Sequence, residues 1–393
     1  MTITLKAHPS LYSAFDVYPS AKGAATHIHQ AAGTLFDRAG GGLLYTLGNE
    51  ELPRYQREPG NIEILRFGGL VENYLHRALS FSAELSKILN NGLKDSLKIA
   101  QFRDPWSGVP VLRHGEGRFA TIYEVNGLPS IELPAAFPNV SAATLHKLRK
   151  MEDECLDQAT RIVVPSTIIR THLIRRGVSG TRIEVIANGT RITPLQPRPA
   201  EAPARYVLYF GAVQDWQGLD VLLQAWRQLQ DLPNLQLVIC SSVKSRRAKA
   251  YQKLVQRLGL ENHVQWHFQL SKEQLAPWIS NAYLTVAPLT ECPRNIEQGC
   301  CPLKILESMG AGVPVVASDL PVVHELIRHR ENGYLIAPER PSELARALRV
   351  LLEYPDTVTQ LGHAARQTIE NGFLWSQANE RLGRIHMELL KEK

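Results

Sequence analysis

Short apolar runs and longer amphipathic stretches alternate along the first half of the chain. The runs span 97–102, 119–125, 161–165 and 183–187. Each run ends near Asp, Ser, Asn, Gly or Pro, which is typical of a buried strand followed by a turn. The intervening stretch 143–159 places its apolar side chains on one helical face. Strand alternating with helix predicts a parallel sheet that is covered on both sides.

The same alternation restarts after a proline-rich stretch. Residues 193–204 carry four prolines and no apolar period, which predicts an interdomain linker. Beyond it, the pattern predicts strands at 206–210, 235–240, 264–268, 283–287 and 313–317, and helices at 218–229, 302–310 and 341–353.

We therefore predict an α/β protein of two Rossmann-like, doubly wound domains that face a central cleft. The expected parts are an N-terminal domain at 1–190, the linker at 191–204, a C-terminal domain at 205–370, and a C-terminal helix at 371–393 that packs back on the N-terminal domain. Ligands of open parallel sheets bind outside the carboxyl ends of the strands. Two facing sheets would thus offer one site for each of two substrates.

Composition fits a globular protein of this size. The 393 residues are 44% hydrophobic and 21% charged, and no apolar run approaches the ~20 residues of a membrane span. The N-terminus lacks the pattern of a signal peptide, and the five cysteines are an odd number. We expect reduced thiols and a cytoplasmic location.

The distribution of charge bears on which partners the protein could bind. The net charge is +6, and basic residues cluster at 147–150, 170–182 and 244–257. No aromatic residues interleave with these runs, so we expect no nucleic-acid binding. The runs fit either solvated helix faces or weak peripheral contact with the anionic inner face of a membrane.

The stretch 286–327 carries the most specific chemistry. A strand ends at Pro288, a polar loop follows, and Pro302 opens a helix whose free N–H groups form an anion site. Lys304 lies in the first turn, and Glu307 follows three residues later on the same face. The pair suits a diphosphate and a ribose diol. The alternative is an exposed ion pair on a surface helix.

The stretch PLKILESMGAGVPVVASD, with ELI and ENGYLIAP after it, resembles the donor-binding signature of the retaining GT-B glycosyltransferases of family four, group 1 type. Further segments resemble that family in the same order: AKGAATHIHQAA, RIEVIANGTRI, YVLYFGAVQDWQGLDVLLQAW and FLWSQANERLGRIHMELL. The likeness covers most of the chain and is strongest from 286 to 337.

The resemblance implies a retaining, metal-independent hexosyltransferase that needs no cofactor. Its donor, a UDP- or GDP-linked sugar, would bind the C-terminal domain. Its acceptor, a glycan, lipid or small molecule, would approach from the N-terminal domain. The implied donor-binding residues are Gly211, Phe268, Leu270, Glu297, Gly299, Cys300, Cys301, Leu303, Lys304 and Glu307. Lys304, Glu307 and Asn126 are the implied catalytic residues, and Gly23 belongs to the loop over the donor phosphates.

Arg103 and Asp104 follow a predicted strand at its carboxyl end and fit either acceptor contact or a structural ion pair. The cysteines at 292, 300 and 301 lack the paired spacing of a zinc site. His27 and His29 would point apart on a helix, so we predict no metal site.

The chain departs from the family pattern at four positions. Gly299 stands where the first glutamate of a pair is expected, and Glu297 or Glu291 would have to replace it. Ala212 and Gln217 stand where two cations are frequent, and Asn126 stands where a histidine is frequent. These changes keep two alternatives open: a non-catalytic nucleotide-sugar-binding GT-B protein, or another GT-B enzyme such as a nucleotide-sugar epimerase.

Overall fold

The computed structural model describes residues 7–69 and 71–392 and divides the chain into two compact units. Unit 1 comprises the described residues of 1–186 together with those of 378–393, and unit 2 is Ala187–Gln377. Unit 1 gives way to unit 2 after Ile186, four residues before the domain boundary expected at 190. The reason is local, because the backbone of Thr190 pairs with that of Phe373 and Trp375 inside unit 2.

Unit 1 is a three-layer α/β unit built on an eight-stranded sheet in the order β3-β4-β2-β1-β5-β6-β7-β8. Its strands are β1 (Ser10–Val17), β2 (Gly42–Leu47), β3 (Tyr55–Glu58), β4 (Ile62–Phe67), β5 (Ile99–Phe102), β6 (Ala120–Glu124), β7 (Arg161–Val164) and β8 (Ile183–Val185). Its helices are α1 (Gly23–Ala39), α2 (Tyr74–Ile88), α3 (Lys94–Ser96), α4 (Pro105–Gly115), α5 (Pro129–Ala136), α6 (Ala142–Gln158), α7 (Thr167–Arg175) and most of α15 (Trp375–Lys391).

The four strands predicted in this half are present as β5 to β8, and the predicted helix at 143–159 is α6. All neighbouring strands run parallel except β3, which pairs antiparallel with β4. The chain winds outward from the centre in both directions, so the order reverses between β1 and β5. That reversal point is where ligands of such sheets bind.

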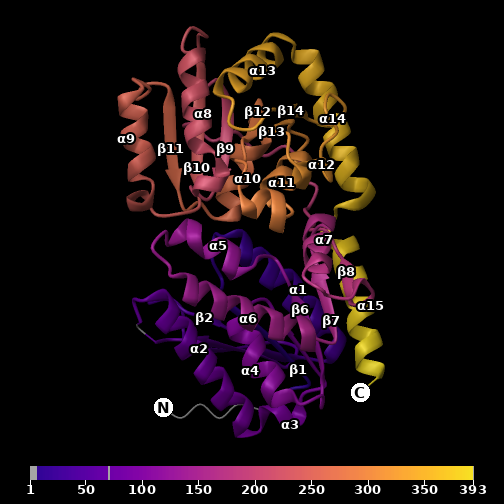
Figure 1. The fold of residues 1–393 in the computed structure, drawn as a ribbon. Coiled ribbons are helices and arrows are strands. Elements are labelled where there is room, and N and C mark those ends of the chain that lie inside the picture. The colour runs from indigo at the N-terminus through magenta and orange to yellow at the C-terminus, as the bar shows by residue number, and fades with distance from the viewer. Residues whose placement is uncertain (1–6, 70, 393) are drawn as a thin grey trace. The chain divides into compact units, whose positions relative to one another are not determined.

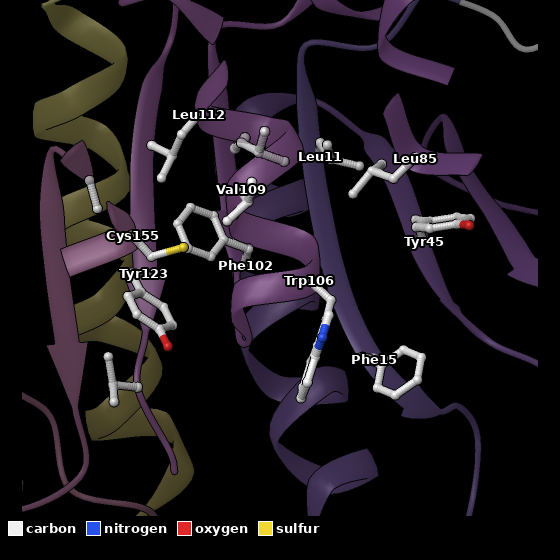
Figure 2. Packing of buried hydrophobic residues seen from close by; sticks show 14 of the residues in the cluster. Leu11, Phe15, Tyr45, Leu85, Phe102, Trp106, Val109, Leu112, Tyr123 and Cys155 are labelled. Carbon is white, nitrogen blue, oxygen red and sulfur yellow. The ribbon is translucent and has the colours of Figure 1, made fainter. Parts of the chain in front are cut away.

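Three helices pack on the central strands of unit 1. Figure 2 shows side chains of β1, β5 and β6 packed against α2, α4 and α6. The rings of Phe102 and Tyr123 stack with centroids 5.0 Å apart, and Phe15 lies 5.3 Å from Trp106. The strands carrying the reversal point are therefore held rigidly by buried aromatic side chains.

The C-terminal helix α15 lies beside β8 (Figure 1). From residue 378 onward it belongs to unit 1. His386 hydrogen-bonds Gln101 of β5 at 2.8 Å, and Arg381 donates to the carbonyl of Val185 at 2.6 Å. The end of the chain thus packs against the sheet formed by its beginning.

Unit 2 is a parallel sheet of six strands in the order β11-β10-β9-β12-β13-β14. The strands are β9 (Arg205–Gly211), β10 (Leu235–Ser241), β11 (Val264–Phe268), β12 (Leu284–Ala287), β13 (Val315–Ser318) and β14 (Tyr334–Ile336). The helices are α8 (Leu219–Trp226), α9 (Lys249–Arg257), α10 (Lys272–Ser280), α11 (Leu303–Gly310), α12 (Pro321–His324), α13 (Pro341–Glu353) and α14 (Pro355–Gly372). All five predicted strands are present, and the order reverses between β9 and β12.

The proline-rich segment at 191–204 contains no helix or strand. It packs on unit 2, where the backbone N–H of Gln196 donates to Ser280 at 3.2 Å and Asn281 donates to the carbonyl of Gln196 at 3.0 Å. Among the helices of the described part, none combines the length and the apolar composition that crossing a bilayer requires.

Candidate functional site

The reversal point of the unit 2 sheet lies between the ends of β9 and β12. Gly211 ends β9 with φ 117°, a conformation that favours glycine. A short 3₁₀ turn at Asp215–Gln217 follows and precedes α8. Gly218 lies so close to the β12 end that an added Cβ would stand 1.8 Å from the carbonyl oxygen of Pro288. The turn after β9 and the end of β12 are therefore in direct backbone contact at this point.

The loop after β12 leads into helix α11. Pro302 has extended backbone angles and stands just before the helix, and Leu303 is its first residue. Cys300 and Cys301 are buried, and the side-chain amide of Asn188 donates to the carbonyl of Cys301 at 2.7 Å. This buried bond fixes the entry of the chain into α11, whose first N–H groups remain available to an anion.

Lys304 turns its ammonium inward rather than to solvent. Its Nζ is buried and has no hydrogen-bond partner among residues 7–69 and 71–392, and it lies 4.2 Å from the centroid of the Tyr209 ring. A Cβ on Gly211 would be 3.4 Å from Lys304 Cε, so the side chain crosses the end of β9. Burial lowers the pKa of Lys304 to about 7, although the carboxylate of Glu307 opposes that shift.

Glu307 lies on the same helix and has a strongly perturbed carboxyl group. Burial raises its pKa to about 7, against the attraction of Lys272 and Lys304. Lys272 opens α10 and was not predicted from the sequence as part of this site. Two cations and one carboxylate thus act on one another at this point, and Lys304 and Glu307 are not the exposed surface pair of the alternative interpretation.

The loop at 290–299 is tied to the 3₁₀ turn after β9. Asn295 is fully buried, and its amide donates to the carbonyls of Trp216 at 3.0 Å and Thr290 at 2.8 Å. The guanidinium carbon of Arg294 lies 5.2 Å from the centroid of the Trp216 ring. In the same turn, the buried Oε1 of Gln217 has no hydrogen-bond partner in the described part of the chain.

Gly299 is buried and has φ 86° and ψ 169°, a region essentially restricted to glycine. A glutamate would be strained here, so the first glutamate of the family pair could not occupy this backbone conformation unchanged. Glu297 and Glu291 are both exposed. The structure therefore brings Glu307, but neither of these carboxylates, into the buried group around Lys304.

Phe268 is the last residue of β11, and Leu270 follows two residues later. Phe268 stacks on Trp266 with centroids 5.6 Å apart, and both residues are partly buried. Gln269 between them has φ 52°, and its N–H donates to the carbonyl of Ser241 at the end of β10. These side chains are thus fixed at the carboxyl edge of the sheet, as a base-pocket wall requires.

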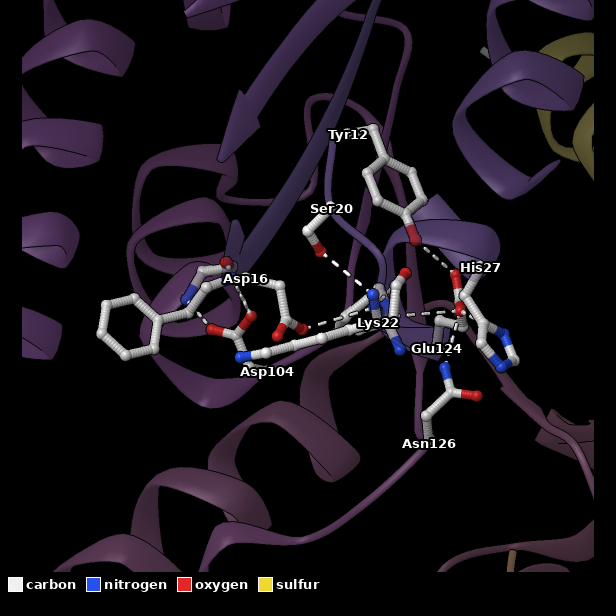
Figure 3. Close-up of polar contacts among 12 residues, drawn as sticks. Tyr12, Asp16, Ser20, Lys22, His27, Asp104, Glu124 and Asn126 are labelled. Carbon is white, nitrogen blue, oxygen red and sulfur yellow. Dashed lines mark hydrogen bonds and ion pairs between the residues drawn. The ribbon is translucent and has the colours of Figure 1, made fainter. Parts of the chain in front are cut away.

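In unit 1, several polar side chains converge on Glu124 at the end of β6, and Figure 3 shows Tyr12, His27 and Asn126 around it. Glu124 accepts from Tyr12 at 2.7 Å, from Gln101 at 2.9 Å and from Asn126 at 2.6 Å, and it pairs with Arg103 at 3.3 Å. Because the Asn126 amide nitrogen donates to Glu124, its carbonyl oxygen remains an acceptor. Glu124 was not predicted from the sequence.

Arg103 and Asp104 lie at the reversal point of unit 1 but are engaged within it. Arg103 also pairs with Asp16 at 3.4 Å, and its side chain is 7% exposed. Asp104 caps α4 by accepting a hydrogen bond from the backbone N–H of Ser107 at 2.8 Å. Its other carboxylate oxygen accepts from the N–H of Phe15 in β1 at 2.7 Å. Burial raises the pKa of Asp104 to about 6. Both residues therefore have structural partners, as in the ion-pair alternative.

Gly23 is exposed and begins α1, directly after Lys22. Within residues 7–69 and 71–392, no group of three or more His, Cys, Asp or Glu side chains is arranged to hold a metal ion.

Comparison with known protein families covers most of the chain. The family described as Glycosyl transferases group 1 matches residues 196–368, and the one described as Glycosyltransferase Family 4 matches residues 21–193. The chain is a family 4, group 1 glycosyltransferase. The expected family is thus confirmed from both units.

Curated relatives of this glycosyltransferase include D-inositol 3-phosphate glycosyltransferases. The protein of that name from Thermobispora bispora is 28% identical over 263 residues, which are 61% of this chain and 58% of the relative. The one from Streptomyces scabiei is 25% identical over 281 residues, 63% of this chain and 60% of the relative. The matched region is less than two thirds of each relative.

Solved structures share the fold over nearly the whole glycosyltransferase chain. Sucrose-phosphate synthase from Thermosynechococcus elongatus has a TM-score of 0.81 at 19% identity, covering 98% of this chain and all of that one. Anabaena HepE, solved with UDP and glucose, has a TM-score of 0.74 at 19% identity, covering 96% and 99% of the two chains. The GT-B assignment is confirmed, with two parallel-sheet, Rossmann-like domains.

Proposed function

We propose that this chain transfers a hexose-type sugar, with retention, from a UDP- or GDP-linked donor to an acceptor hydroxyl. The observation that carries the proposal is the buried ammonium of Lys304 at the start of α11, where the unit 2 sheet reverses its order; no described residue accepts a hydrogen bond from it. The group 1 family match and the UDP and glucose bound to HepE support a nucleotide-sugar donor. The acceptor would be a glycan, a lipid or a small molecule.

The donor diphosphate gains negative charge as the glycosidic bond breaks. Lys304 and the N–H groups opening α11 would stabilise that charge. The acceptor hydroxyl oxygen would attack the anomeric carbon from the side that the diphosphate leaves. A donor phosphate oxygen would take the hydroxyl proton, so the products are the glycoside and the protonated nucleoside diphosphate. No carboxylate nucleophile is required.

Glu307 and Asn126 would bind hydroxyl groups of the ribose and of the sugar. Glu307 would accept hydrogen bonds from the ribose diol of the nucleotide, in its ionised form. Asn126 would accept a hydrogen bond from a sugar hydroxyl through its side-chain carbonyl oxygen, because its amide nitrogen already donates to Glu124. An amide cannot act as a base near neutral pH, so Asn126 would position the sugar rather than deprotonate it.

The mechanism is tested by the stereochemistry of the first product. Donor screening by thermal shift would first identify a nucleotide-sugar that stabilises the protein, because a ligand at 100 times its Kd adds about 2.7 kcal/mol. Proton NMR of the early product should then show the anomeric configuration of that donor. Clean inversion would rule out the proposed mechanism.

A non-catalytic nucleotide-sugar-binding role is the second candidate. It is favoured by Gly299, which stands in place of the first glutamate of the family pair and has a positive φ that a glutamate would rarely adopt. Such a protein would bind the donor without releasing nucleoside diphosphate over an acceptor panel. Nucleotide release that depends on an acceptor would instead support transfer and exclude an epimerase.

Weak binding to an anionic membrane face is also proposed. Arg176 pairs with Glu152 at 2.8 Å and with Asp153 at 2.5 Å, so its charge is compensated within unit 1. Lys147 and Lys150 on α6 are exposed. Each surface cation contributes about 1 kcal/mol toward anionic lipid. Sedimentation with anionic vesicles at low salt should exceed that with neutral vesicles and should fall in Lys147→Gln/Lys150→Gln; equal sedimentation with both lipids would contradict the idea.

A further inference from the structure

Two cationic side chains reach the end of β9 and the turn that follows it, Lys304 from α11 and Arg294 from the loop after β12. The buried nitrogen of Lys304 lies beside the ring of Tyr209 and has no hydrogen-bond partner in the described part of the chain. The positive charge of Arg294 acts on that nitrogen and lowers the pKa of Lys304 further. Like charges placed together repel, and a buried ammonium without a partner destabilises the protein. An anion bound between them would remove both unfavourable effects.

The guanidinium of Arg294 is held in place by the half-buried Trp216 and the buried Asn295. It lies over the Trp216 ring, and its Nη1 donates to the side-chain oxygen of Asn295 at 3.1 Å. Asn295 is itself fixed, because its amide nitrogen donates to the carbonyls of Trp216 and Thr290. Arg294 is half-buried, so its position does not depend on an exposed, freely moving side chain.

The turn that carries Trp216 supplies no cation of its own. Residues 211–218 read GAVQDWQG and contain neither Lys nor Arg. The N–H of Thr290 donates to the Trp216 carbonyl at 3.2 Å, which joins the loop of Arg294 to this turn. Arg294 thus brings a positive charge from the loop after β12 to the turn after β9.

We propose that Arg294 is a second phosphate-binding residue of the donor site, which binds the nucleoside diphosphate group together with Lys304. Trp216 is a positioning residue that holds the guanidinium. This proposal rests on the proposed function, since it assigns the anion to the diphosphate of the donor. A planar guanidinium can donate two parallel hydrogen bonds to phosphate oxygens, which an ammonium cannot.

The test is calorimetric binding of nucleoside diphosphates to the full chain. UDP, GDP and ADP are titrated first, and the tightest is then compared with its monophosphate in the wild type, Arg294→Gln, Lys304→Met and the double variant. Glutamine keeps a donor toward Asn295 but removes the charge. Arg294→Gln should weaken diphosphate binding about tenfold or more, because a charge-assisted hydrogen bond contributes about 1.5–3 kcal/mol.

Further readouts separate phosphate binding from loop folding. The preference for diphosphate over monophosphate should fall in Arg294→Gln, and the two single losses should not add in the double variant, as expected of neighbouring groups on one ligand. Arg328→Gln is the matched control, since its side chain is 81% exposed in a surface pair with Glu331. It should leave both affinities unchanged.

Trp216 gives a test of the positioning role. Trp216→Ala should lower diphosphate affinity in the wild-type background but have little effect in Arg294→Gln. Trp216→Phe should restore most of the affinity, because it keeps an aromatic face for the guanidinium. An equal loss of affinity from Trp216→Ala in both backgrounds would contradict the role assigned to this ring.

The outcomes distinguish this proposal from the one it rests on. If Lys304→Met weakens binding and Arg294→Gln does not, the role of Arg294 is overturned and the donor site stands. If neither variant changes binding, or the wild type binds no nucleoside diphosphate, the donor site at α11 is overturned as well.

Discussion

At the scale of single residues, Lys304 shows how a side chain can be prepared for a ligand at a cost to the free protein. Its ammonium faces Tyr209 and the end of β9, and none of the residues that the structure describes accepts a hydrogen bond from it. Burial brings its pKa down to about 7. Donor binding would provide the missing anion and would raise the pKa again. The unfavourable burial in the free protein is therefore released when the proposed donor binds.

Lys304→Met should stabilise the ligand-free protein at low pH. Below pH 7 the lysine is charged in both the folded and the unfolded chain, so the full burial cost is present. As the pH rises from about 7 toward 10.5, the folded chain loses its proton first and the cost disappears. The variant should melt about 2–4 °C higher than wild type at pH 6, with a smaller difference at pH 9.

The comparison uses thermal unfolding without nucleotide, with Lys253→Met on the exposed face of α9 as the matched control. The control should show no such pH-dependent difference. A variant that melts below wild type at pH 6 would mean that the protein itself already stabilises the ammonium.

At the scale of elements, the site depends on two strand ends held in contact. Gly218 has φ 64°, and an added Cβ would meet the carbonyl of Pro288 at 1.8 Å. Gly218→Ala should therefore push the turn after β9 away from the loop after β12. We expect a loss of about 1–3 kcal/mol in unfolding free energy together with weaker donor binding.

Gly259→Ala provides the matched control for that variant. Gly259 has φ 65°, and its added Cβ would meet nothing within 4 Å. Both substitutions place a side chain in the same backbone conformation, so the difference between them reports the close approach alone. Equal effects of the two on donor binding would show that the contact between the strand ends is unimportant.

Elements also show how far the sequence could predict the fold. Strands such as 235–240 and 264–268 were predictable, because each is a short apolar run bounded by polar turns. Strand β1 was not predicted, since Ser10, Ser13 and Asp16 interrupt its apolar residues. Ser13 is buried only because its hydroxyl pairs at 2.9 Å with that of Ser107, far along the chain. Such distant pairing leaves no local pattern.

The candidate site was predictable in its outline but not in its environment. Pro302 and the spacing of Lys304 and Glu307 indicated a helix start with opposite charges on one face. The burial of Lys304 arises from Tyr209 and Gly211 on strand β9, and the attraction of Lys272 on Glu307 comes from helix α10. These contacts follow from the sheet order, which local sequence does not contain.

At the scale of the whole molecule, the proposal assigns the donor diphosphate to side-chain cations and helix N–H groups. We therefore expect transfer without a divalent ion. Activity measured after EDTA treatment and gel filtration should equal that of the untreated protein, and added Mg²⁺ or Mn²⁺ should change it little. Complete loss that either ion restores would contradict the metal-independent mechanism.

The most direct measurement is the steady-state kinetics of Lys304→Met with the nucleotide-sugar donor. Methionine keeps an apolar stem and removes the charge that would stabilise the leaving diphosphate. Losing a charge-assisted hydrogen bond of about 1.5–3 kcal/mol predicts a decrease in kcat/KM of about tenfold to more than a hundredfold. Near-wild-type kcat/KM in a correctly folded Lys304→Met protein would contradict the account.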